Sequence, residues 1–155
     1  MASHVRKQIR DRAVTVLTGL DTTGDRVFAS RFRELDESDL PALLIFTGDE
    51  DIEVSTIKGG GAARQARSCS LVVWAVAQDR EDLDDQIDTI IAEVETALFA
   101  DWTDTAGSFG DLCKTLDLTS IETDFTDGAR QPLGHARIEF TAEYHTAEGA
   151  PTATV

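Results

Sequence analysis

The sequence predicts an α+β domain in which a mainly antiparallel sheet carries two helices on one face. Two segments, residues 3–20 and 80–100, have apolar residues at the three-to-four spacing of an amphipathic helix. Strand patterns lie between and after them, in the order helix, three or four strands, helix, two strands. The chain has 155 residues and 41% apolar content, which is ample for one core. We therefore predict a single domain over residues 1–146 and a flexible tail over residues 147–155.

The first helix has a plausible N-cap at Ser3 and a stop signal at Gly19. A short strand is expected at residues 26–30, in RVFAS, followed by the acidic segment RELDESDL at residues 33–40. That segment carries too many charges to be buried, so we predict a solvated loop.

The next segment, PALLIFT at residues 41–47, is apolar without alternation, as in a strand covered on both faces. Pro41 suits its first position, where no ladder donor is needed. The acidic GDED at residues 48–51 does not have the spacing of a calcium loop, so we expect a solvated hairpin turn. IEVSTI at residues 52–57 would then be the hairpin partner.

The longest strand candidate is ARSCSLVVWAVAQ, residues 66–78, and it is apolar on both sides. Two helices on one face leave the other face uncovered. The side that carries Trp74 therefore needs another cover, either the loop at residues 99–107 or a neighbouring subunit.

The second helix has Asp79 as its expected N-cap and acidic first turns, which suit the positive end of a helix dipole. Residues 101–111 are expected to form a loop, and strands are expected at residues 112–126 and 135–146. In the last strand apolar residues alternate strictly with polar ones, so one face is buried. The predicted inward residues are Ala136, Ile138, Phe140, Ala142 and Tyr144.

The chain is strongly acidic, with 14 basic and 29 acidic residues and a formal charge of −15. Such a surface repels phosphate backbones, because nucleic-acid affinity depends mainly on cations that displace counterions. We therefore do not expect tight DNA binding, although an acidic wall would let a duplex slide past. No apolar run approaches the roughly 20 residues that cross a bilayer, so we expect a soluble, cytosolic protein without membrane contact.

No pattern of catalytic or metal-binding residues is present. Cys69 and Cys113 do not have the paired spacing of a zinc site and are too few for a disulfide framework, so buried thiols are expected. None of His4, His135 and His145 belongs to a zinc-protease motif, and no serine lies in a nucleophile elbow. We predict no enzymatic activity, no cofactor and no metal.

The glycine-rich segment IKGGGAARQAR, residues 57–67, places three glycines among cations. A phosphate loop has its glycines between a strand and a helix, usually followed by Lys and Ser or Thr. Here Lys58 precedes the glycines and a strand follows, so nucleotide binding is excluded. Two interpretations stay open: a flexible hairpin tip, or an arm whose Arg64 and Arg67 pair with carboxylates of an acidic partner, such as another copy of this chain.

Four phrases resemble one family in order and spacing: RKQIRDRAVTVLTGL near the start, DRVFASRFRELDESDLPALLIFTGDEDIE, LFADWTDTAG and QPLGHARIEFTAEYHT. They are similar to the tail terminator proteins of long-tailed bacteriophages, the minor tail protein U type, over residues 4–146. The acidic ELDESD segment and the alanine- and threonine-rich tail depart from the family pattern.

The resemblance implies a structural virion protein of the tail and neck, present in the host cytoplasm during assembly. Members form a hexameric ring on the last ring of the tail tube protein, stop tube polymerisation, and provide the surface for the head connector or stopper protein. Genomic DNA passes through the channel without specific binding. The alternative is a small intracellular α+β module that binds a protein or ligand on its apolar sheet face.

The residues themselves suggest an interface hypothesis for such a ring, in which basic patches of one copy meet the acidic second helix of the next. The expected interface residues lie in the glycine segment, the first helix and the longest strand: Lys58, Gly59, Gly60, Gly61, Arg64, Arg67, Arg6, Arg10 and Trp74.

Overall fold

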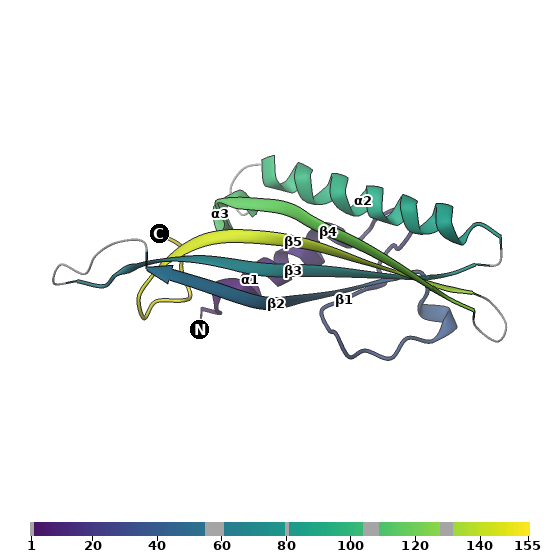
Figure 1. The fold of residues 1–155 in the computed structure, drawn as a ribbon, viewed down its shortest axis with the longest axis horizontal. Helices are drawn as coiled ribbons and strands as arrows, with labels where there is room; N and C mark the ends of the chain where they lie inside the picture. Colours follow the sequence, from purple (N-terminus) through teal and green to yellow (C-terminus); the bar gives the residue numbers. More distant parts are fainter. Residues whose placement is uncertain (1, 55–60, 80, 104–108, 128–131) are drawn as a thin grey trace.

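One mixed five-stranded sheet organises the computed structural model, which describes residues 2–54, 61–79, 81–103, 109–127 and 132–155 (Figure 1). The strand order is β1-β2-β3-β5-β4. β1 pairs parallel to β2, and all other neighbours are antiparallel. The strands are β1 Val27–Phe28, β2 Ala42–Val54, β3 Arg64–Gln78, β4 Thr115–Thr126 and β5 Leu133–Ala147.

Two long helices, α1 Val5–Leu17 and α2 Leu83–Thr103, pack on the same face of this sheet. α1 contacts β2 and β3, whereas α2 contacts β3 and β5. A single-turn helix, α3 Phe109–Leu112, contacts both long helices, and a 3-10 turn, η1 Glu37–Asp39, interrupts the loop before β2. The predicted α+β class is confirmed, with the parallel β1 as an addition.

The core fills the space between the helices and the inward faces of β2, β3 and β5. The alternation predicted for β5 is confirmed, since its five predicted inward residues are at most 5% exposed. Each helix contributes one apolar stripe, as its spacing predicts. The stripes are Val5, Ile9, Ala13 and Leu17 on α1, and Ile87, Ile90, Ile91, Val94 and Leu98 on α2.

The helix ends differ from the predicted ones by a few residues. α1 starts after His4, whose ring nitrogen accepts a hydrogen bond from the backbone N–H of Arg6, and Ser3 is not its cap. Gly19 lies just beyond the end of α1 with a φ of 94°, a conformation that glycine adopts without strain. α2 begins at Leu83, later than predicted, and the predicted cap Asp79 accepts a hydrogen bond from the N–H of Glu81 at 3.1 Å, ahead of the helix.

The region between α2 and β4 was predicted as a loop, and part of that prediction is wrong. Residues 101–103 form the last turn of α2, and residues 109–112 form α3. Asp101 connects the two elements: its carboxylate, at the end of α2, accepts hydrogen bonds from Arg12 of α1 and from the N–H of Phe109, the first residue of α3. The start of β4 moves accordingly from residue 112 to Thr115.

The predicted turn at residues 48–51 is also wrong, since β2 runs without a break to Val54. A register shift between Thr47 and Glu50 marks a bulge in the pairing with β3. A bulge inserts one residue and so reverses which side chains point inward. Glu50 therefore turns toward the core side, while Asp49 and Asp51 stay exposed.

The C-terminal segment after β5 is held against the domain, in contrast to the free tail that its composition predicts. The N–H of Val5 donates to the carbonyl of Pro151, and the N–H of Glu148 donates to the carbonyl of Ala63. The side chain of Gln8 also donates to the carbonyl of Thr152. These bonds occupy backbone groups at the open end of α1 and at the start of β3.

Candidate assembly surface

Only part of the glycine-rich segment, residues 57–67, lies within the described residues. Lys58, Gly59 and Gly60 lie outside the described residues, and Gly61 is exposed. Arg64, which was predicted to lie in the loop or arm before the strand, is part of β3, as is Arg67, which the predicted strand at residues 66–78 already included. The strand starts earlier than predicted because its first residues pair with β5, where Arg64 lies opposite Ala147.

The predicted cationic patch is engaged largely within the chain. Arg67 donates from Nη1 to Glu50 at 3.0 Å and from Nε to the hydroxyl of Thr146 at 2.9 Å. Its side chain is only 10% exposed. Arg64 donates to the carbonyl of Val155 at 3.1 Å, and Arg6 donates to the carbonyl of Gly48. Arg67 is therefore a poor candidate for pairing with a neighbouring molecule.

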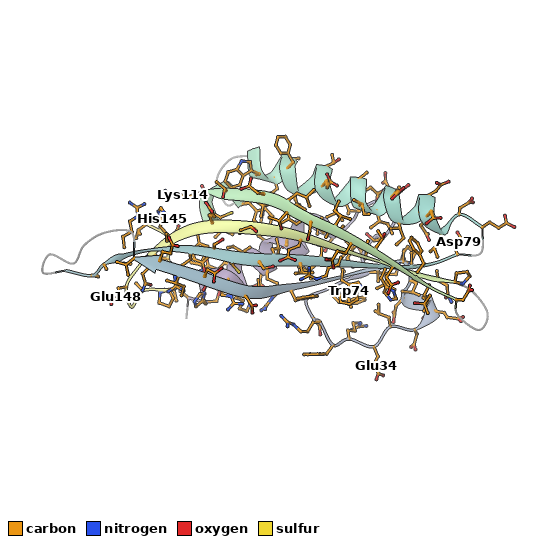
Figure 2. All side chains as sticks on the ribbon, in the orientation of Figure 1. Glu34, Trp74, Asp79, Lys114, His145 and Glu148 are labelled. Carbon is orange, nitrogen blue, oxygen red and sulfur yellow. The ribbon has the colours of Figure 1, made fainter. Side chains whose placement is uncertain are left out.

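Arg10 and Trp74 complete the predicted set and lie on different faces of the molecule. Arg10 is half-buried on α1, on the helix side of the sheet. Trp74 is 37% exposed and projects from β3 on the opposite side, toward the segment that carries Glu34 (Figure 2). Its ring meets His135 edge to face at a centroid distance of 6.0 Å. The described members of the predicted set therefore do not form one patch.

The cover of the Trp74 face is the segment before β2, which the sequence analysis did not consider. Residues 30–40 cross below the sheet (Figure 1). They leave a hollow of about 270 Å³ against the sheet, whose lining includes Leu35, Leu40, Leu44, Trp74 and Val76. This acidic segment is solvated, as predicted, but it also shelters part of the second apolar face.

Two arginines anchor this covering segment and leave a phenylalanine outside. The guanidinium of Arg31 lies 4.6 Å from the ring centre of Phe46 and donates to the carbonyl of Thr47 at 2.6 Å. The guanidinium of Arg33 lies 3.8 Å from the ring centre of Phe28. Such cation–π contacts fix the two arginines on the sheet edge. Phe32, between them, is 86% exposed.

A second exposed apolar surface lies on the opposite edge of the sheet, along α2 and β4. Phe99 of α2 is 69% exposed, and Leu118, Ile121 and Phe125 of β4 are each at least 40% exposed. A hollow of about 230 Å³ opens between the helix and the strand. This α2–β4 groove is lined by Glu95, Leu98, Phe99, Trp102, Leu116, Leu118 and Phe140.

The surroundings of the α2–β4 groove are acidic. Neither α2 nor β4 contains a lysine or arginine. Asp88, Ala92, Glu95 and Phe99 recur at helical spacing and so share one side of α2, the side that borders the groove. β4 is the last strand in the sheet, so its outer edge has no partner strand among the described residues. Its exposed Asp117 alternates with Leu116 and Leu118 and so points to the face away from the groove.

Neither exposed apolar surface was predicted from the sequence. Phe32 has a weak signal in the sequence, a lone aromatic between two arginines in a loop. The exposed side of β4 has a clearer signal in the sequence. Four apolar residues lie on the side of this strand that faces the helices: Leu116, Leu118, Ile121 and Phe125. This pattern predicts a buried face, and the apolar side chains are exposed only because β4 lies beyond the area that α2 covers.

The reactive side chains do not form a catalytic arrangement within the described part of the chain. Burial raises the pKa of Cys69 to about 11 and that of Cys113 to about 12, so both thiols are protonated at neutral pH. The two cysteines are buried and unbridged, as predicted. No group of three or more metal-binding side chains occurs among the described residues.

Comparison of the sequence with protein-family models and with curated proteins finds no match. Among the helices that the structure describes, none is both long and apolar enough to cross a membrane. Two features of the described surface are therefore candidates for contact with another molecule: the apolar α2–β4 groove, which carries Glu95, and the exposed Phe32 between two arginines near the β1 edge.

Proposed function

We propose that this chain is a structural tail terminator of a long-tailed phage or prophage. Six copies would form a ring on the end of the tail tube, stop its growth and offer a surface to the head connector. The observation that carries the proposal is the exposed apolar surface along α2 and β4, which includes four large side chains. Exposed apolar side chains gathered on one edge of a domain are typical of a surface that contacts another protein.

The charge of the chain is compatible with a channel that conducts DNA. Six copies would carry a formal charge of −90, six times the −15 of one chain. A wall of that sign does not hold a phosphate backbone, so a genome could pass without sticking. The same charge opposes assembly, and the ring therefore needs apolar contact and local charge pairing between neighbours.

Electron microscopy of the purified protein with polymerised tail tubes tests the proposal. We expect a ring about 100 Å across, as six domains of this size around a channel would give, bound at one end of each tube. Tubes formed in its presence should stop lengthening. A protein that remains monomeric and leaves tube ends bare and growing would contradict the proposal.

The alternative function, a small binding module, has one observation in its favour. The hollow beside Trp74 combines apolar residues with Arg31, Arg33 and His135. At about 270 Å³ it lies just below the usual range of ligand pockets, roughly 300–1,000 Å³. A monomer whose Trp74 fluorescence responds to a small anionic aromatic compound, with no effect on tubes, would favour this alternative.

A further inference from the structure

We propose that Phe32 of one copy inserts into the α2–β4 groove of the next copy, with Arg31 and Arg33 facing the acidic border of the groove. The inference rests on the proposed ring and names its subunit contact. It differs from the interface predicted from the sequence, of which one cation, Arg67, is buried in an ion pair within its own chain.

Phe32 has the properties of an insertion residue. It is 86% exposed, the highest value among the large apolar side chains that the structure describes. Its position is fixed from both sides, since Arg31 and Arg33 lie on the rings of Phe46 and Phe28. Its own N–H donates to the hydroxyl of Ser30 at 3.2 Å. A preorganised aromatic loses little freedom on binding, which favours affinity.

The groove suits one aromatic side chain better than a free metabolite. Its volume of about 230 Å³ is below the roughly 300 Å³ at which ligand pockets begin. Phe99 and Trp102 on α2 and Leu118 on β4 supply apolar walls of the kind in which aromatic anchors are found. Glu95 is the charged residue of the lining.

The two arginines beside Phe32 favour the acidic groove of a second copy as its partner, whereas residues 34–39, which follow them, are acidic. The groove side of α2 presents Asp88 and Glu95, and no cation of α2 or β4 offsets them. The insertion residue lies between two exposed arginines. Opposite charges at the rim of an apolar contact guide the encounter and fix its register.

The positions of the two surfaces fit a ring. Phe32 follows β1, the first strand in the sheet order, and the groove borders β4, the last strand. The covering segment also runs on the face away from α2 (Figure 1). A chain with two complementary surfaces at opposite edges joins its copies head to tail, and such a heterologous contact closes into a ring when the rotation allows.

Two single variants and their mixture test the contact. Phe32→Asp removes the insertion residue and keeps the groove, whereas Leu118→Asp blocks the groove and keeps the insertion residue. Each variant alone should associate about 30-fold more weakly than wild type, the loss typical of an aromatic anchor. An equimolar mixture should form one-to-one dimers, because a single intact contact remains between the two variants. Val54→Asp, at another exposed apolar residue, is the matched control and should assemble as wild type does.

A photocrosslinking measurement keeps the test valid if Leu118→Asp does not fold. A variant with a benzophenone amino acid at position 32, mixed with isotope-labelled wild type, should crosslink to residues 95–102 or 116–118 of the labelled chain, both in solution and on tubes. Crosslinks elsewhere, or unchanged rings with Phe32→Asp, would overturn this contact and leave the proposed function intact. Failure of wild type to form rings or to cap tubes would instead overturn the proposed function.

Discussion

The phenol of Tyr144 donates a hydrogen bond to the carboxylate of Glu50, a residue 94 positions earlier in the chain. The other carboxylate oxygen lies 3.0 Å from Nη1 of Arg67, which is the cross-strand partner of Tyr144. The bulge in β2 makes this possible, because it turns Glu50 inward between two outward aspartates. Burial, followed by the bond to Glu50, raises the pKa of Tyr144, so the phenol stays a donor.

We expect Glu50→Ala to destabilise the fold by about 3–5 kcal/mol, because it leaves the buried guanidinium of Arg67 without its counter-charge. Both side chains of the pair are at most 10% exposed, so water cannot compensate. Urea unfolding followed by circular dichroism measures the loss. The exposed neighbour Asp51 provides the control, and Asp51→Ala should change stability by no more than about 0.5 kcal/mol. Equal effects of the two substitutions would contradict an inward Glu50.

Asp101→Asn should lower stability at neutral pH by about 1.5–3 kcal/mol, the contribution of hydrogen bonds to a charged group. Burial acts to raise the pKa of Asp101, but hydrogen bonds from Arg12 and from the N–H of Phe109 outweigh it and lower that pKa. The folded state therefore favours the charged form. Its contribution is complete above the unfolded pKa, about 3.9, and disappears as the pH falls through the lower folded-state pKa.

The stability difference between wild type and Asp101→Asn should therefore shrink below about pH 4. Thermal unfolding at a series of pH values checks this. Asp51→Asn, at an exposed residue of β2 outside the proposed subunit contact, is the matched control and should not change stability at any of these pH values. A difference that persists unchanged at low pH would show that the ionised carboxylate is not the cause.

Gly134→Ala should destabilise the fold by about 1–3 kcal/mol, the usual cost of overpacking a core. A methyl group on Gly134 would approach Leu83 at 3.1 Å and Ile87 at 3.2 Å, where α2 crosses β5. Gly61→Ala, where a methyl group meets no atom within 4 Å, is the control. Chemical unfolding of both variants gives the comparison, and a neutral Gly134→Ala would place α2 farther from β5 than the structure does.

The imidazole of His145 should titrate below the usual pKa of histidine, about 6.5. Burial lowers its pKa, and Arg64 and Lys114 lower it further, while Glu143 acts in the opposite direction. The unfolded chain then binds the proton more tightly, so stability declines as the pH falls from the unfolded pKa through the lowered one. NMR titration of the ring protons measures the shift, and Lys114→Gln should raise the midpoint. A midpoint above 6.5 in wild type would contradict this environment.

The local pattern of apolar and polar residues was sufficient to predict the elements in which apolar residues recur with one regular period. The stripes of α1 and α2 and the alternation of β5 identify their buried faces, because 3.6-residue and two-residue periods translate directly into geometry. The two-sided apolar character of β3 also predicts correctly that both of its faces need cover. Nothing in that pattern says which segment provides the cover.

The sequence by itself therefore determined the α+β class, the helices, the main strands, the acidic surface and the burial of both thiols. Only the tertiary structure decided that Glu50 turns inward, that residues 30–40 cover Trp74, and that Phe32 and the α2–β4 groove are exposed at opposite edges. The physical reason is that strand register and strand order depend on pairing between distant segments. A one-residue bulge reverses the faces of a strand, and an edge position exposes an apolar side that would be core anywhere else in the sheet.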